Sequence, residues 1–246
     1  MEDEINELQI KAQQGDALAQ CELGKRYVLG NGVLQDYEQA EYWFRKAAEQ
    51  GNAIGQFLLG FCYSKGTGVA KDHSKAVFWY SKAAAQGLAP AQCHLGMSYD
   101  DGLGVPQDYK LAVYWYQKAA DQDDEEAQNN LGVCYNEGHG VSQDYSKAVY
   151  WLRKGAEQGD DNAQNNLGYS FFYGNGVPKD YTQAVYWFSK AAEQGHADAQ
   201  CYLGYCYEKG YGVQKDMTKA VEFYKKAAEQ GNVAAKYNLR AIMSLS

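Results

Sequence analysis

The chain of 246 residues has only three prolines, no long apolar run and no cluster of basic residues. No stretch approaches the roughly 18 uninterrupted apolar residues of a membrane-spanning helix, so no transmembrane segment is expected. The acidic opening Met-Glu-Asp-Glu-Ile lacks the basic and apolar regions of a secretory signal peptide, which favours a cytoplasmic location. Export by a signal-independent system is the alternative that the sequence leaves open.

Positive charge is also scarce. The chain has 23 Lys and Arg against 31 Asp and Glu, a formal net charge of −8. A phosphate backbone would be repelled, and so would an anionic lipid surface. We therefore expect neither nucleic acid nor membrane among the partners.

The sequence has instead a repeat of 36 residues. Its most regular markers are the glycine of a Leu-Gly pair, a tryptophan and an aspartate, each in its own phase. They are Gly24, Gly60, Gly96, Gly132, Gly168 and Gly204; Trp43, Trp79, Trp115, Trp151 and Trp187; and Asp36, Asp72, Asp108, Asp144, Asp180 and Asp216. Such a period indicates a solenoid, in which each unit buries its apolar face on its neighbours.

Repeat four shows the parts of the unit. Ala127, Leu131 and Tyr135 lie four apart and mark one face of a first helix. Gly138 then supplies the left-handed position that ends this helix, and Asp144 is a natural N-cap for a second one. Because period-two alternation and β-branched runs are missing, the sequence predicts an all-α fold.

Three recurring residue types predict contacts within the solenoid. The glycine of the Leu-Gly pair lies inside a helix, where it costs about 0.5–1 kcal/mol relative to alanine, so its recurrence predicts close approach by another helix. The tryptophans and tyrosines of the second helices are assigned to the core rather than to stacking on sugars or bases. The fourth-position glutamines predict hydrogen bonds between neighbouring repeats. These are Gln20, Gln56, Gln92, Gln128, Gln164 and Gln200.

The two ends of the chain resemble incomplete repeats. Residues 5–16 match the last part of a second helix, and the tail matches a first helix in which Arg240 replaces the glycine. We predict an N-terminal capping helix, six repeats and a C-terminal capping helix. The predicted boundaries are 1–16 for the first cap, 17–52, 53–88, 89–124, 125–160, 161–196 and 197–232 for the repeats (together 17–232), and 233–246 for the last cap.

The repeat resembles that of the Sel-1-like repeat family, a relative of the tetratricopeptide repeat. The resemblance rests on A-x-A-Q-x-x-L-G-x-x-Y, G-x-G-V and D-Y-x-x-A-V-x-W-x-x-K-A-A-E-Q-G, in six copies. It implies a right-handed superhelical solenoid of helix-turn-helix repeats. Members of that family act as adaptors and scaffolds in bacterial signalling, envelope assembly and host interaction, and in eukaryotic protein degradation.

One branch of that family carries a disulfide in every repeat, and this chain departs from it. Only Cys201 and Cys206 share a repeat, and five helical residues place them about 140° apart around the helix. Pairing between repeats, such as Cys62 with Cys93, stays open, but we expect reduced thiols. The penicillin binding reported for that branch is not transferred to this chain.

No catalytic, cofactor or metal site can be assembled from the sequence. The Gly-x-Gly loops follow a helix rather than a strand, so they predict helix ends rather than phosphate cradles. His94 follows Cys93 directly, which does not place both on one helical face. The histidines fall in four different repeat phases: His73, His94, His139 and His196. Polar residues that recur in every repeat are more economically structural, so we predict no enzyme, no cofactor, no metal and no small-molecule substrate.

Function should therefore lie where the copies differ. The resemblance to tetratricopeptide arrays implies that first helices line a concave groove through the second, fifth, ninth and twelfth positions of each repeat. Asparagine amides there suit a peptide backbone, and aromatic rings suit anchors of a peptide or helix. The alternative is that some of these residues only pack between adjacent first helices. Asn130 and Asn166, at the neighbouring sixth position, add further amides. The candidates are Lys25, Phe57, Phe61, Met97, Asp100, Asn129, Asn130, Asn136, Asn165, Asn166, Tyr169, Phe172, Tyr205 and Glu208.

These observations together predict a non-catalytic scaffold or adaptor that binds a partner protein or peptide in the groove. A secreted or host-directed bacterial effector or virulence interaction protein is the first alternative. A hydrolase is the remote one.

Overall fold

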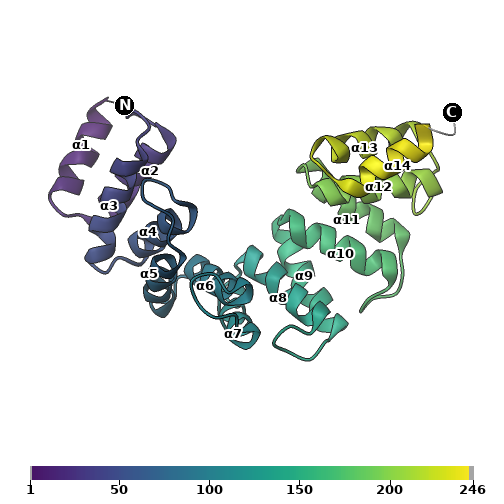
Figure 1. Ribbon diagram of the computed structural model, residues 1–246, viewed down its shortest axis with the longest axis horizontal. Coiled ribbons are helices and arrows are strands. Elements are labelled where there is room, and N and C mark those ends of the chain that lie inside the picture. Colours follow the sequence, from purple (N-terminus) through teal and green to yellow (C-terminus); the bar gives the residue numbers. More distant parts are fainter. Residues whose placement is uncertain (1, 244–246) are drawn as a thin grey trace. The chain divides into compact units, whose positions relative to one another are not determined.

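The computed structural model describes residues 2–243, which form fourteen α-helices and no strand (Figure 1). The first helices of the repeats are α2 (Ala17–Leu29), α4 (Ala53–Lys65), α6 (Ala89–Asp101), α8 (Glu125–Glu137), α10 (Asp161–Tyr173) and α12 (Ala197–Lys209). The second helices are α3 (Tyr37–Glu49), α5 (His73–Ala85), α7 (Tyr109–Ala120), α9 (Tyr145–Gln158), α11 (Tyr181–Glu193) and α13 (Met217–Glu229). The chain starts with α1 (Glu2–Gln13) and ends with α14 (Val233–Met243). The prediction of an all-helical repeat fold is confirmed.

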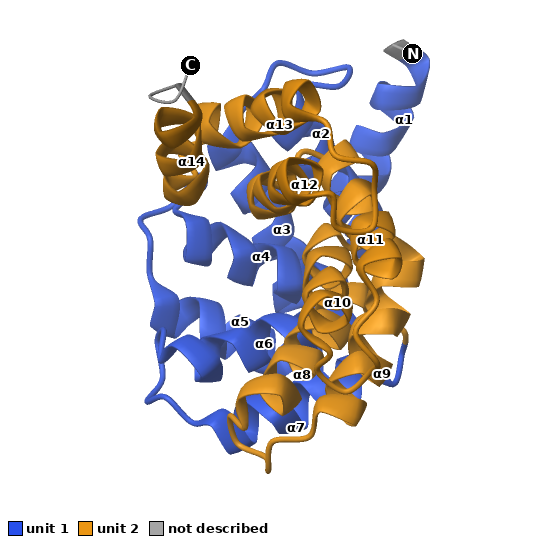
Figure 2. Ribbon diagram, turned by 90° about the vertical axis from the view of Figure 1, so that its right-hand side faces the viewer, with its two compact units in different colours: residues 1–122 blue, residues 123–246 orange. Residues whose placement is uncertain are grey.

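The chain divides after Gln122 into two compact units, drawn in blue and orange in Figure 2. Unit 1 holds α1 to α7, and its largest core cluster is built around Phe44, Leu59 and Tyr80. Unit 2 holds α8 to α14, with a core cluster that includes Leu167 and Phe188. In both units each helix packs mainly on its neighbours in the sequence, as expected for a repeat array.

Caps define where the helices begin and end. Every second helix starts after an aspartate whose side chain accepts hydrogen bonds from backbone N–H groups two or three residues on, as at Asp144. Every first helix of a repeat ends on a left-handed glycine, such as Gly138 with φ 78°. Both predictions are confirmed. Among the first helices of the repeats, α6 lacks a side-chain cap, because it begins after Leu88, and it has Pro90 in its first turn.

The Leu-Gly glycines lie under the second helix of their own repeat. A methyl group added at Gly60 would lie 2.7 Å from the Tyr80 ring, closer than carbon atoms can approach. The predicted close approach is therefore confirmed, but the group over the glycine is the residue after the tryptophan rather than the tryptophan itself. The pairs are Gly24 with Phe44, Gly60 with Tyr80, Gly96 with Tyr116, Gly132 with Leu152, Gly168 with Phe188 and Gly204 with Tyr224.

The fourth-position glutamines form the predicted hydrogen bonds between neighbouring repeats within each unit. Gln56 is 5% exposed, and its Nε2 donates to the Ala48 carbonyl at the end of the preceding repeat at 3.3 Å. Its Oε1 accepts from Gln86 Nε2 at 2.8 Å, and Gln86 also donates to the Gly51 carbonyl at 2.9 Å. One buried side chain thus ties three successive helices together.

Three further features bear on chemistry. All six cysteines are free and buried. Within residues 2–243, no helix is both long enough and apolar enough to cross a membrane. Asp123, with φ 63°, is the only described residue other than glycine in the left-handed region, and it stands where other repeats end on glycine.

Candidate binding niches between adjacent repeats

The fifth-position candidates lie in the contact between adjacent first helices. The Phe57 ring packs edge-on against His94 of the next repeat, with ring centroids 5.2 Å apart. Asn166 Nδ2 donates to Asn129 Oδ1 at 2.9 Å in the same way. Asn129 and Asn165 are 7% and 4% exposed, so the structure places both in packing contacts. The alternative interpretation, that some candidates only pack between adjacent first helices, therefore fits Phe57 and Asn129.

The two acidic twelfth-position candidates, Asp100 and Glu208, each accept a hydrogen bond from a tyrosine of their own unit. Tyr116 donates its hydroxyl to Asp100 Oδ2 at 3.2 Å, and Tyr224 donates to Glu208 Oε2 at 2.8 Å. Burial opposes ionisation of Glu208, but hydrogen bonds from Lys209 and Tyr224 outweigh it and lower the pKa of this carboxyl. The Glu208 carboxyl is therefore ionised at neutral pH. Of the other two twelfth-position candidates, Phe172 is 6% exposed and Asn136 lines a hollow described below.

The ninth-position candidates form the accessible row. Lys25 is exposed and Phe61 is 37% exposed, while Met97, Tyr169 and Tyr205 are half-buried. Burial raises the pKa of Tyr169 to about 12, so its hydroxyl stays protonated at neutral pH. Half-exposed aromatic groups of this kind are typical anchors for a bound segment.

A hollow lies between repeats one and two in unit 1, and we call it the repeat 1–2 niche. Its volume is about 630 Å³, and its walls are mainly apolar. Lys25 and Phe61 of the predicted set line it, above a floor that includes Phe44 and Cys62, each 2% exposed. The other niche residues used below are Val28, Leu29, Tyr37, Leu58 and Thr67.

The equivalent hollow between repeats four and five of unit 2, the repeat 4–5 niche, is smaller and polar. Its volume is about 240 Å³. It contains three of the predicted residues, Asn136, Asn166 and Tyr169. Glu137 and Asn175 add a carboxylate and a further amide. Such a set offers both donors and acceptors to a peptide backbone.

The structure thus gathers five of the predicted residues into two niches and places Phe57, Asn129, Asn165 and Phe172 in packing contacts. The sequence prediction did not include the loop residues Thr67 and Asn175, which line the niches. A signal for them existed, because they stand between the two glycines of the Gly-x-Gly loop and differ from copy to copy. The residues at this fifteenth position are Asn31, Thr67, Leu103, His139, Asn175 and Tyr211.

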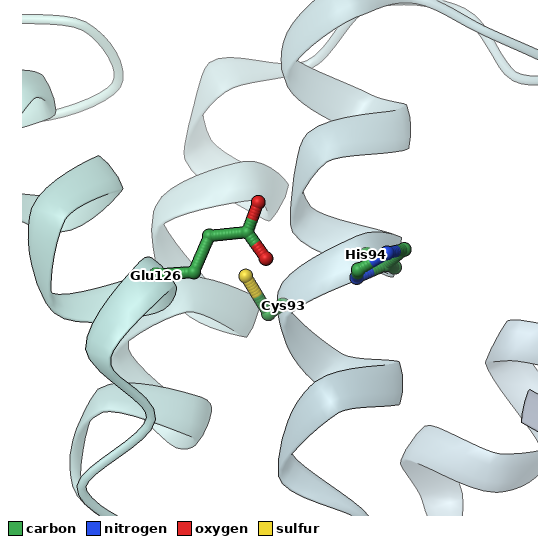
Figure 3. Close-up of side chains that lie close together, drawn as sticks. All are labelled: Cys93, His94 and Glu126. Carbon is green, nitrogen blue, oxygen red and sulfur yellow. The ribbon is translucent and has the colours of Figure 1, made fainter. Parts of the chain in front are cut away.

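Cys93 and His94 are consecutive residues of α6, and their side chains leave the helix in different directions (Figure 3). The Cys93 Sγ and a ring nitrogen of His94 lie within 4.8 Å of each other, although consecutive residues on a helix point about 100° apart. The His94 ring packs edge-on against Tyr80, with centroids 5.4 Å apart. Glu126, also drawn in Figure 3, belongs to the other unit. Two side chains of unit 1 do not make a metal site, which needs three or four ligands.

Tandem helix pairs with these capped ends and inter-repeat hydrogen bonds define an α-helical repeat solenoid. The profile of the Sel1 repeat matches residues 17–52, 53–88, 89–124, 125–160, 161–196 and 197–232. The chain therefore belongs to the Sel1 repeat family, as the sequence resemblance indicated. Proteins of this family are in general protein-interaction scaffolds.

Solved structures of similar proteins come from several bacteria. A protective antigen of uropathogenic Escherichia coli with an SLR fold is 41% identical over 96% of this chain and 51% of its own, with a TM-score of 0.83. A Sel1 repeat protein from Oxalobacter formigenes is 38% identical over 87% of this chain and 86% of its own, with a TM-score of 0.81. The chain spans about half the length of the E. coli protein. Among curated proteins, none matches this chain.

A more distant likeness extends to an immunity protein of Pseudomonas aeruginosa. It is 19% identical over 89% of this chain and 83% of its own, with a TM-score of 0.58. This likeness concerns the fold alone.

Proposed function

We propose that the protein is a non-catalytic scaffold that holds a segment of a partner protein along the first-helix surface of its repeats. The observation that carries this proposal is the distribution of variation. Glycines, aspartates and glutamines that build the repeat hardly change, whereas the residues lining the niches change from copy to copy. A surface that varies on a constant frame is what selective recognition of a partner requires.

The chemistry of the niches supports a protein ligand. The repeat 1–2 niche offers apolar walls to a side chain, and the repeat 4–5 niche offers amides to a backbone. Central anchors surrounded by polar groups are typical of protein interfaces.

A host-directed interaction protein is the second candidate, and one observation favours it. The E. coli protein that is 41% identical over most of this chain is described as a protective antigen. Detection of the protein in culture supernatant or in host cells would support this candidate. Retention of all of it inside the producing cells would contradict it.

Site-directed photo-crosslinking in the native cell tests the scaffold proposal. A photoreactive amino acid is placed at Phe61 and at Tyr169, and the captured proteins are identified by mass spectrometry. The matched control position is Tyr114, an aromatic residue of α7 that is 50% exposed and does not line either niche. We expect the two niche positions to capture the same partner and the control to miss it.

Alanine substitutions complete this test. Phe61→Ala and Tyr169→Ala should each weaken binding of the captured partner, and Tyr114→Ala should leave it unchanged. The proposal is wrong if folded niche variants bind the partner as tightly as the parent protein. The remote hydrolase alternative would require turnover of a substrate that a single substitution abolishes.

A further inference from the structure

The niches between repeats are built from the same three positions, and these positions carry different chemistry in each niche. They are position twelve of one repeat and positions six and fifteen of the next. The residues are Val28, Leu58 and Thr67 between repeats one and two; Asn136, Asn166 and Asn175 between repeats four and five; and Phe172, Tyr202 and Tyr211 between repeats five and six.

Between repeats five and six, the chain's own aromatic rings occupy this place. Phe172 is 6% exposed, and its ring centroid lies 5.7 Å from that of Tyr202 and 6.1 Å from that of Tyr211. Tyr211 also stacks on Tyr181 at 4.6 Å with nearly parallel planes. Edge-on and stacked contacts at these distances are favourable aromatic packing. The fold therefore accommodates several rings at this position.

The niche between repeats one and two keeps aromatic residues at two equivalent positions but lacks the rings of Phe172, Tyr202 and Tyr211. Tyr37 stands where repeat five has Tyr181, and Phe61 stands where repeat six has Tyr205. Val28, Leu58 and Thr67 replace the three rings, and the hollow of about 630 Å³ lies among them. Protein interiors are close-packed. Because the equivalent place between repeats five and six is filled by aromatic rings, the apolar hollow between repeats one and two has a shape that suits an aromatic ring.

We infer that the repeat 1–2 niche receives an aromatic side chain of the partner segment, with a carboxylate beside it that pairs with Lys25. This inference rests on the proposed function and names the chemistry of the segment that the scaffold holds. The aromatic side chain takes the place that Phe172 and Tyr211 take between repeats five and six. The carboxylate is a neighbouring acidic residue or the C-terminus of the segment.

The charges around the niche support the carboxylate. Lys25 is exposed and has no ion-pair partner among the described residues. None of the described residues that line the niche is acidic, although the chain as a whole carries a net charge of −8. Lys65 lies nearby, with its Nζ 5.6 Å from the centroid of the Phe61 ring. An apolar hollow with cations at its edge attracts a group that is aromatic and anionic.

Binding of N-acetyl-phenylalanine to the full chain, followed by protein NMR, tests this inference. The probe combines one aromatic ring with one carboxylate, and a ligand of this size is expected to bind with a Kd of about 1 mM. Saturable shifts are expected at Val28, Leu58 and Thr67. N-acetyl-phenylalanine amide, which lacks the carboxylate, should bind about threefold more weakly, as expected for an exposed ion pair. N-acetyl-alanine should not bind.

Two variants separate the ring from the charge. The triple variant Val28→Phe, Leu58→Tyr and Thr67→Tyr installs the rings found between repeats five and six, so it should lose the probe and melt at a higher temperature. Lys25→Glu keeps the hollow and should weaken the carboxylate probe more than the amide probe. If the triple variant does not fold, Thr67→Tyr alone tests the same point and should weaken the probe several-fold.

The inference is overturned if the shifts lie elsewhere, if N-acetyl-alanine binds equally well, or if filling the niche leaves binding unchanged. These outcomes are distinct from failure of the proposed function. A partner captured from Phe61 and Tyr169 together with no probe binding would overturn only the inference. Probe binding with no captured partner would overturn the scaffold proposal and leave a site for a free aromatic acid.

Discussion

Gln86 donates its side-chain amide to Oε1 of Gln56 at 2.8 Å, although the two residues lie on different helices and 30 positions apart in the chain. The Nε2 of Gln56 in turn donates a hydrogen bond to the Ala48 carbonyl of the preceding repeat. The same pair recurs within each repeat of both units, for example between Gln194 and Gln164 at 3.0 Å. A residue with one donor group and one acceptor group is suited to join two neighbours in this way.

Gln56→Ala should therefore destabilise unit 1 by about 1–2 kcal/mol. The substitution removes two hydrogen bonds from a buried site and leaves the Gln86 amide with only the Gly51 carbonyl. Urea unfolding followed by circular dichroism measures the change. Gln39→Ala, an exposed position of α3, is the matched control and should change stability by less than about 0.5 kcal/mol. Equal effects of both substitutions would contradict a structural role for the hydrogen bonds of the fourth-position glutamines.

Gly60→Ala should destabilise the fold by about 1–3 kcal/mol, despite the higher helix propensity of alanine. The new methyl group would lie 2.7 Å from the Tyr80 ring and 3.2 Å from the Ala76 carbonyl oxygen. A double-mutant cycle with Tyr80→Ala checks the cause by urea unfolding, because the ring is absent in that background. If Gly60→Ala costs as much without the ring as with it, the glycine has another role.

The stability of unit 2 should depend on pH through Asp160. Burial, together with the neighbouring carboxylates of Asp161 and Glu126, raises the pKa of Asp160 to about 6, although the hydrogen bond from the Ala163 N–H opposes this shift. In the unfolded chain the group ionises near pH 4, so the folded state binds the proton more tightly. The free energy of unfolding should therefore fall as the pH rises from about 4 to about 6.

Asp160→Asn should remove this loss. Asparagine keeps a side-chain oxygen to accept from the Ala163 N–H but carries no charge. We expect a gain of about 1 kcal/mol at pH 7 and little gain at pH 4, measured by urea unfolding at both pH values. Asp124→Asn, at the cap of α8, is the matched control and reports what an asparagine cap does by itself. A gain of the same size at pH 4 would contradict the electrostatic cause.

The cysteines should be unreactive until the protein unfolds. Burial raises the pKa of Cys62 and of Cys206 to about 12, so at pH 8 almost no thiolate is present. Iodoacetamide should leave the native protein essentially unlabelled and should label all six cysteines in urea, as read by intact mass. Ser146→Cys, at an exposed position of α9, is the control and should be labelled in the native state. Rapid labelling of the native parent protein would contradict this prediction.

Local chemistry in the sequence was sufficient for the helices and their ends. Asp144 predicts a helix start and Gly138 a helix end because capping depends on residues within a few positions of each other. The Leu-Gly glycine predicts a close approach, since a glycine inside a helix needs a reason. Which side chain lies over it, Tyr80 rather than Trp79 in repeat two, was not predictable, because one position on a helix turns a side chain by about 100°.

The candidate site was predictable only in part, for a similar reason. Phe61 and Tyr169 were found from their phase and their variation. Phe57 and Asn129 satisfy the same spacing but contact the adjacent first helix, which spacing within one helix does not reveal. Thr67 lies in a loop, where no helical period applies, so its place beside Val28 and Leu58 depends on how two repeats stack.

The sequence by itself determined the number of repeats, the pairing of helices within each repeat and the glutamine hydrogen bonds between neighbouring repeats. All three depend on residues that recur every 36 positions. Tertiary structure decided which variable residues meet. Val28, Leu58 and Thr67 leave a hollow of about 630 Å³, whereas the equivalent Phe172, Tyr202 and Tyr211 pack their rings together. The physical reason is that a niche is formed by side chains from two repeats, and its volume depends on how closely their rings and methyl groups pack.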